Sequence, residues 1–122
     1  MRVQLSNPAK HSPPCRKFEA MIDSGAAICI FHSDVANAIG LRIAQGELSE
    51  TIGISGAKTA IYLHNVSLHV PGGFMFKIRA GFTDEVPIAG LLGRIGFFEH
   101  FKITFDPSSV PPGFDLERFY RA

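Results

Sequence analysis

The chain has 122 residues, of which 46% are hydrophobic and 19% charged, and this suits one folded domain with a modest core. Its formal net charge is +1, and its 12 basic residues are spread along the sequence, which gives nucleic-acid binding little support. No apolar run approaches the roughly 20 residues of a membrane-spanning helix, so we expect no membrane insertion. We expect a soluble protein of the cytoplasm or a soluble domain of a longer chain.

Short runs of alternating apolar and polar residues, separated by Gly and Pro, predict a mostly β fold. The first run covers residues 17–22, where Phe, Ala and Ile share one face and Lys, Glu and Met the other. The second and third runs, residues 62–70 and 74–79, are joined by a Pro-Gly-Gly turn at 71–73. A later strand is expected over residues 101–105, before an Asp-Pro pair.

Helix is expected only in short pieces. Ser33 is a candidate N-cap for a helix over residues 34–39, and Gly40 stands where a left-handed C-terminal residue would lie. A second short turn is expected over residues 94–99.

The ends of the chain are predicted to be irregular. Residues 6–15 and 107–115 are rich in Pro and Ser, which indicates surface loops. Residues 116–121 either return as an edge segment or stay disordered.

The cysteines and histidines offer little sign of other chemistry. Cys15 and Cys29 do not make a disulfide framework in a chain this apolar, so we expect reduced thiols. Cys29 lies between two isoleucines and is expected to be an inert, buried thiol. His64 and His69 are an odd number of residues apart in a predicted strand and so face opposite sides, which argues against a metal site.

Asp23 follows an apolar strand and precedes Ser24 and Gly25, at a point where the strand is expected to break into a tight turn. Taken alone, this pattern is typical of an ordinary Asx-turn. The motifs around it favour a functional interpretation.

Residues 21–26, Met-Ile-Asp-Ser-Gly-Ala, resemble the apolar-apolar-Asp-Thr/Ser-Gly-Ala signature of retroviral-type (retropepsin-like) aspartic proteases. The next segment, residues 31–41, resembles the one that follows this signature in bacterial relatives. Residues 89–94, Ala-Gly-Leu-Leu-Gly-Arg, are similar to the second signature of the family, in which an apolar pair precedes Gly-Arg and a short helix and a strand follow. Together the two motifs and their spacing cover about residues 16–106.

The resemblance implies a mostly β, retropepsin-like acid protease barrel, a single lobe with one or two short helices. The domain would span residues 1–122, with its core at about 16–106 and with ends that are loops or segments of a dimer sheet. Residues 3–5 and 116–120 are the candidates for that sheet. Such chemistry needs two aspartates and the chain has one such motif and no internal repeat, so the functional unit would be a two-fold homodimer.

The resemblance also assigns roles to the first motif. Asp23 would be the catalytic carboxylate, a general acid/base that activates water for attack on a peptide carbonyl. Ser24 would donate a hydrogen bond across the dimer axis, and Gly25 would offer its carbonyl to the substrate backbone. Ala26 completes the active-site turn.

In the second motif, Leu91 and Leu92 would pack behind the aspartate, and Gly93 would allow two crossing segments to approach closely. Retroviral enzymes often carry an acidic residue that pairs with the arginine, and here that position is Ala27. Arg94 therefore needs another partner. The candidates are Glu99, Asp34 and a main-chain carbonyl.

Residues 51–58 carry two glycines near a tip and predict a β-hairpin. Its place between the two motifs favours a flap that covers substrate, with Gly53, Ile54, Ser55 and Gly56 as candidate substrate-binding residues. Apolar pockets would be lined by Ile30, Ile54, Leu91 and Leu92. No metal or organic cofactor is implied, because two carboxylates and one water suffice.

We therefore expect an aspartic endopeptidase that hydrolyses peptide bonds with a water activated by paired aspartates from two subunits. Its partners would be a second copy of the chain and a peptide or protein substrate, and its pH optimum would be acidic. One alternative is a catalytically weak or inactive module of the same fold that dimerises or binds peptides. Another is a generic, monomeric β-barrel binding domain whose motifs match by chance.

Overall fold

The computed structural model describes residues 1–52, 58–106 and 113–118, and the side chains of residues 1–51 and 58–101. The strands are β1 (Arg2–Ser6), β2 (Phe18–Glu19), β3 (Met21–Ile22), β4 (Ile30–His32), β5 (Glu47–Ile52), β6 (Lys58–Val70), β7 (Phe74–Thr83), β8 (Gly90–Leu92), β9 (Phe101–Asp106) and β10 (Gly113–Arg118). The helical pieces in these residues are α1 (Ser33–Ala38) and the 3-10 turns η1 (Ile43–Gln45) and η2 (Phe98–His100). The mostly β fold expected from the alternating runs is confirmed.

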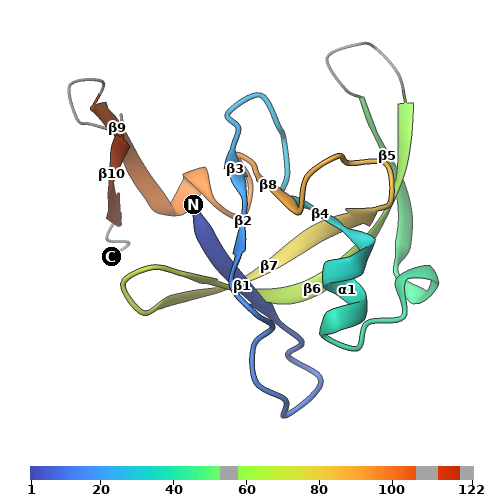
Figure 1. Ribbon diagram of the computed structural model, residues 1–122. Helices are drawn as coiled ribbons and strands as arrows, with labels where there is room; N and C mark the ends of the chain where they lie inside the picture. The colour runs from blue at the N-terminus through green and yellow to red at the C-terminus, as the bar shows by residue number, and fades with distance from the viewer. Residues whose placement is uncertain (53–57, 107–112, 119–122) are drawn as a thin grey trace.

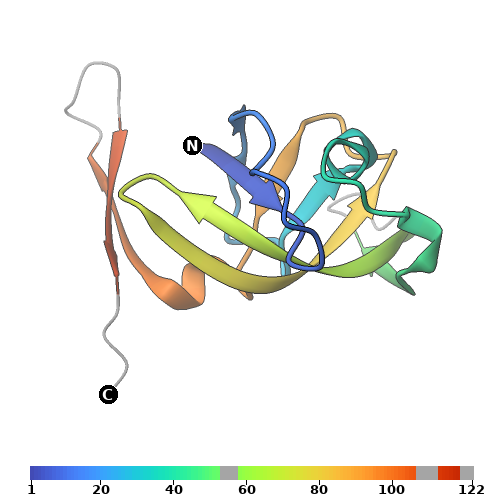
Figure 2. The same cartoon turned by 90° about the horizontal axis from the view of Figure 1, so that it is seen from below.

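Within the described residues, eight strands form one sheet in the order β2-β1-β6-β7-β4-β8-β3, with β5 paired to β6 beside this path. The two ends of that order, β2 and β3, are separated in the sequence only by Ala20, so the sheet must curl back on itself. Figures 1 and 2 show the resulting barrel, with β9 and β10 as a separate hairpin at its side. The barrel brings β3 and β8 together, and these two strands carry the two sequence motifs.

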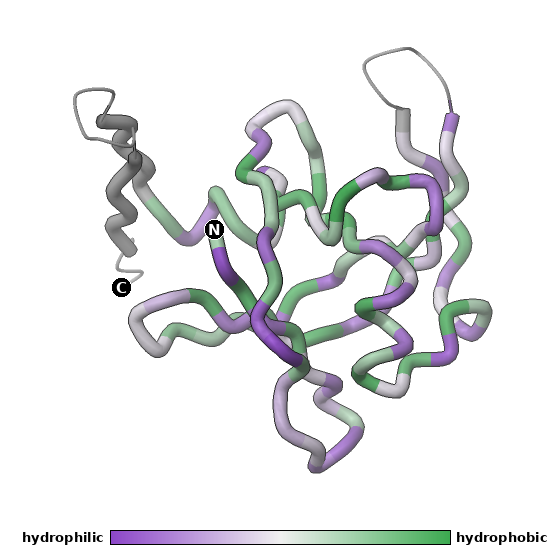
Figure 3. Tube along the Cα trace, in the orientation of Figure 1, coloured by the Kyte–Doolittle hydropathy of each residue, from purple (hydrophilic) through white to green (hydrophobic). Residues whose placement is uncertain are grey.

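The alternation in the sequence correctly assigns the core face of the barrel. In the first run Ala20 is buried, whereas Lys17, Glu19 and Met21 are exposed. The turn between β6 and β7 has positive φ at both of its glycines, 93° and 80°, which L side chains rarely adopt. Figure 3 shows apolar residues along the barrel strands and a largely hydrophilic loop between β1 and β2. The largest fully buried side chains are Phe31, Phe82, Phe97, Leu5, Ile61, Leu68 and Leu92.

The helix α1 begins one residue earlier than the sequence predicts. Ser33 is the first helical residue and is buried, and the N-cap is His32, whose Nδ1 accepts a hydrogen bond from the Asp34 N–H at 3.0 Å. The expectation of Ser33 as N-cap is therefore wrong, because a histidine with an extended backbone fills that position one residue upstream. The predicted C-terminal end is confirmed, since Gly40 has a φ of +72°.

The two ends of the chain differ from expectation. Residues 3–5 are part of β1, which pairs with both β2 and β6 of its own chain, so this segment belongs to the barrel sheet; its part in a dimer sheet stays a prediction. The loop expected over residues 107–115 is wrong at its end, because β10 begins at Gly113. Residues 113–118 pair antiparallel with β9, so the edge-segment alternative is confirmed for residues 116–118.

Both cysteines are free thiols, as expected, and Cys29 is fully buried. Burial raises the pKa of the Cys29 thiol to about 11, above the ordinary value of 9.0. None of the helices in the described part of the chain is long and apolar enough to cross a membrane.

Alkylation should distinguish the two cysteines. Iodoacetamide at about pH 8 is expected to modify only Cys15 in the folded protein, because the thiolate is the nucleophile and Cys29 is both protonated and inaccessible. Mass spectrometry should show one adduct before unfolding and two after it, and a Cys15→Ser variant should show none while folded. Rapid modification of Cys29 in the folded protein would contradict this assignment.

The raised pKa of Cys29 also makes the stability of the protein depend on pH. Its contribution to the free energy of unfolding is present below pH 9.0 and is lost as the pH rises towards about 11.

Candidate active site

Asp23 lies where β3 ends, and the second motif holds it there. The strands β3 and β8 are parallel, with Met21 opposite Leu91 and Ile22 opposite Leu92. The Asp23 N–H then donates to the Leu92 carbonyl at 3.0 Å, which continues the ladder by one hydrogen bond. The backbone of the aspartate is therefore fixed by a segment about seventy residues away in the sequence.

Beyond Asp23 the chain forms a tight Asx-turn. One carboxylate oxygen, Oδ1, accepts the Gly25 N–H at 2.8 Å, and the Asp23 carbonyl accepts the Ala26 N–H at 3.1 Å. A Cβ at Gly25 would lie 3.1 Å from that same oxygen, so a side chain here would crowd the carboxylate. Among the described residues, no other group donates a hydrogen bond to the Asp23 carboxylate. Its second oxygen is left for water, a proton or another chain.

The turn is accessible from outside the barrel. Asp23 and Ala26 are half-buried, and Ser24 and Gly25 are exposed. Figure 1 shows the loop from β3 to β4 standing at one end of the barrel, beside β8. The acidic group thus lies at the surface on a backbone that the barrel positions.

Gly93 allows the segment after β8 to cross directly beneath this turn. A Cβ at position 93 would lie 2.2 Å from the Ile28 carbonyl oxygen and 2.8 Å from that of Ala26. Only glycine permits such an approach of two backbones. Immediately after it, the Arg94 N–H donates to the Ala26 carbonyl and the Ile95 N–H to the Ala27 carbonyl, each at 2.9 Å.

Arg94 finds its partner in the first motif. Its Nη1 donates to the Ser24 carbonyl at 2.7 Å. Of the three expected partners, the structure therefore contains the main-chain carbonyl. Glu99 is engaged elsewhere, since its Oε1 accepts the Gly96 N–H at 3.0 Å. The guanidinium therefore braces the exposed part of the turn from outside, while the Gly93 crossing supports it from beneath.

The apolar residues near Asp23 divide between the core and the surface. Leu92 and Ile30 are buried in the barrel, so the expectation that they line an accessible pocket is wrong for this chain. Leu91 is half-buried on the other face of β8. Ile54, also expected to line the pocket, lies outside the described residues.

Met21 was missed as a candidate site residue. It is 54% exposed, lies opposite Leu91, and is two residues before Asp23, so all three are on one side of the β3–β8 pair. The available signal was an apolar residue on the polar face of a strand that ends at the aspartate.

The two strands of the expected β-hairpin are present, and the role of this hairpin as a flap stays a prediction. The strands β5 and β6 pair antiparallel from Glu47 opposite Leu63 to Ile52 opposite Lys58. Figure 1 shows this hairpin rising at the same end of the barrel as the Asp23 turn. The four candidate substrate-binding residues, Gly53, Ile54, Ser55 and Gly56, lie outside the described residues.

Where the structure is described, no group of three or more His, Cys, Asp or Glu side chains could hold a metal ion.

A barrel with an Asp-Ser-Gly turn braced by a Leu-Leu-Gly-Arg segment is the architecture of a retropepsin-like aspartic protease. The chain belongs to the aspartyl protease family, whose model matches residues 15–94. Its fold is similar to the crystal structure of a retropepsin-like aspartic protease from Rickettsia conorii, with 21% identity and a TM-score of 0.56, covering 84% of this chain and 80% of that one. It is also similar to the EIAV protease complexed with the inhibitor HBY-793, with 20% identity and a TM-score of 0.49, covering 77% and 79% of the two chains. No curated protein matches the chain.

Proposed function

We propose that this protein is an aspartic endopeptidase that works as a two-fold homodimer, with Asp23 of each copy facing a shared catalytic water. The observation that carries the proposal is the state of the Asp23 carboxylate. It stands on an accessible, doubly braced turn, with one oxygen held by the Gly25 N–H and no described donor to the other.

A second copy is needed because the chemistry needs two carboxylates. The crossing segment from β8 brings Arg94 to the turn and carries no acid of its own next to Asp23. In a two-fold pair the exposed Ser24 hydroxyl of each turn is free to bond across the axis, which would lock the two turns together.

The two carboxylates would share one proton, because like charges at close range do not both ionise easily. The ionised Asp23 takes a proton from the water as its oxygen attacks the peptide carbonyl carbon. The protonated Asp23 gives its proton to the carbonyl oxygen. When the resulting diol collapses, its C–N bond breaks, the Asp23 that took the proton of the water gives it to the leaving amine, and a diol hydroxyl returns a proton to the other Asp23, so that the acid and the amine are released.

The substrate would lie as an extended strand over the turn, beneath the hairpin of β5 and β6. Met21 and Leu91 are accessible apolar side chains on the Asp23 side of the β3–β8 pair, so they are our candidates for the pocket wall. The exposed Gly25 presents its backbone to the peptide without a side chain in the way. We infer a preference for apolar residues beside the cleaved bond.

The direct test is cleavage of a peptide library by the purified chain between about pH 3 and 7. We expect cleavage that is strongest at acidic pH and is blocked by a statine-type inhibitor. A dimeric chain without turnover would instead favour the dimerisation or peptide-binding module. A monomeric chain that does not respond to the inhibitor would favour the generic binding domain.

Arg94 is proposed as a positioning residue, and its replacement tests the brace on the turn. Arg94→Ala is expected to lower kcat by about tenfold or more with little change in KM, because a slightly misplaced turn slows the chemistry more than it weakens binding. Arg94→Lys should restore part of the loss, since an ammonium can still donate to the Ser24 carbonyl. Arg42→Ala, which removes another cation outside this turn, is the matched control and should leave both constants unchanged. An unaltered kcat in Arg94→Ala would remove this role.

A further inference from the structure

A pocket opens on the barrel where β1 leaves β6. The β1–β6 pairing runs from Ser6 opposite Ser67 to Gln4 opposite His69 and then stops, while Val3 pairs on its other side with β2. Continued in register, Arg2 would meet Pro71, which has no N–H to give a ladder. The resulting gap is a pocket of about 340 Å³, within the usual range for small-ligand sites. Its lining shares no residue with the Asp23 turn.

The lining of this pocket is cationic. It includes two cations, Arg2 and Lys17, together with the imidazole of His69, and neither Asp nor Glu. Among the described residues, the side chains of Arg2 and Lys17 have no ion-pair or hydrogen-bond partner. The nearby acid, Glu19, is engaged by the amino group of Met1 at 3.2 Å.

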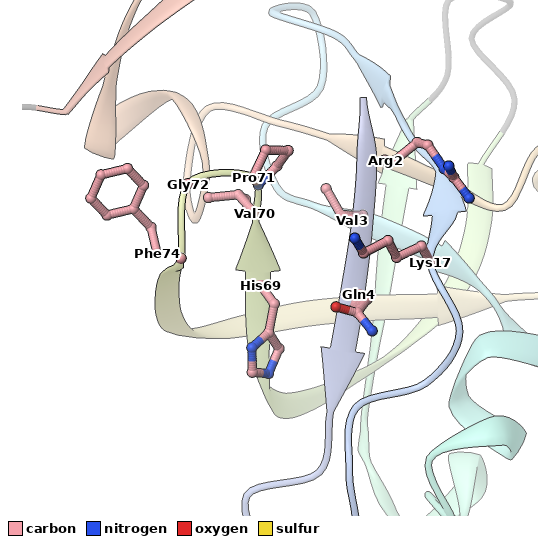
Figure 4. A pocket seen from close by; sticks show the side chains of 10 residues that line it. Arg2, Val3, Gln4, Lys17, His69, Val70, Pro71, Gly72 and Phe74 are labelled. Atoms are coloured by element: carbon pink, nitrogen blue, oxygen red, sulfur yellow. The ribbon is translucent and has the colours of Figure 1, made fainter.

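Lys17 and Gln4 present polar groups to the gap. Figure 4 shows the Lys17 side chain crossing β1 so that its ammonium points towards the β6–β7 hairpin, whereas the guanidinium of Arg2 points away from it. The Gln4 amide oxygen faces the same gap, and its orientation is fixed because Nε2 donates to the Cys15 carbonyl at 2.8 Å. His69 is held at the floor by its Nε2 contact with the Ser6 hydroxyl at 2.7 Å.

We propose that this pocket binds a carboxylate with a small apolar body and an amide N–H, the chemistry of the C-terminal end of a peptide. The carboxylate would bind Lys17, and the amide N–H would donate to the Gln4 oxygen. The apolar part would pack on Val3 of β1 and on Val70 and Pro71 at the end of β6, which are among the lining residues. The site goes beyond peptide hydrolysis, because none of its residues takes part in the proposed chemistry.

Binding can be followed by amide chemical shifts in 15N-labelled protein, with N-acetyl-leucine as the probe. We expect saturable shifts at Gln4, His69 and Gly72. N-acetyl-leucinamide, which lacks the charge, and inorganic phosphate, which lacks the apolar body, should each bind at least about fivefold more weakly. Absence of saturation, or equal affinity for either comparison ligand, would overturn the proposal.

Two variants locate the site. Lys17→Gln should weaken N-acetyl-leucine by about fivefold, whereas Lys77→Gln, an exposed lysine on β7 outside the pocket, should have no effect. Equal affinity in Lys17→Gln and the unaltered protein would place the ligand elsewhere. The titration is repeated in Asp23→Asn, where binding should persist, so the outcome is independent of the proteolytic proposal.

Discussion

Replacing Asp23 with asparagine is expected to lower kcat by about a thousandfold, within the range for loss of a general acid/base group. Asparagine keeps the shape of the side chain, and its amide oxygen can still accept the Gly25 N–H that forms the turn. Its amide does not ionise in water and cannot act as a general acid or base. The variant should therefore lose turnover while its thermal unfolding and its oligomeric state stay as they were.

The measurement is peptide cleavage at the pH optimum, with circular dichroism of both proteins during heating. Asp34→Asn is the matched control, because this carboxylate is 88% exposed on α1 and should be dispensable. Turnover in Asp23→Asn within about tenfold of the unaltered protein would exclude the assigned role of this aspartate.

Gly93→Ala is expected to have the largest effect on stability. The added methyl group would lie 2.2 Å from one backbone oxygen and 2.8 Å from another, and backbone atoms cannot rotate away as a side chain would. The two crossing segments would have to separate, which also moves Arg94 from the turn that it braces. We expect a loss of about 3 kcal/mol or more in the free energy of unfolding and a fall of about 10 °C in Tm.

Gly73→Ala serves as the comparison for this prediction. A methyl group at position 73 would meet no neighbouring group within 4 Å, but the backbone there has a φ of +80°, so the change tests backbone strain without a clash. Its cost should be about 1 kcal/mol. If Gly93→Ala unfolds no more easily than Gly73→Ala, the close crossing does not support the site.

The sequence predicted best what depends on local pattern. Alternation identified the buried face of the first predicted run, residues 17–22, and the glycine at position 40 marked the end of α1. The two motifs also indicated which distant segments meet, because a Gly before Arg94 signals a close backbone approach.

The sequence alone could not predict contacts between segments that lie far apart in the chain. Three partners were open to Arg94, and the choice of the Ser24 carbonyl rests on a contact across 70 residues of sequence. The commitment of β1 to the barrel depends on the pairing of residues 4–6 with β6, more than sixty residues away. Met21 was assigned correctly to the outer face of its strand, but its place beside Leu91 follows only from the parallel pairing of β3 with β8.

The most direct test of a shared active site is to refold the unaltered chain together with an equal amount of Asp23→Asn and to measure cleavage at fixed total concentration. If each site needs an aspartate from both copies, random pairing leaves about one quarter of the activity of the unaltered protein. Chains that act alone would leave about one half. We expect one quarter for a shared site, and one half would contradict it.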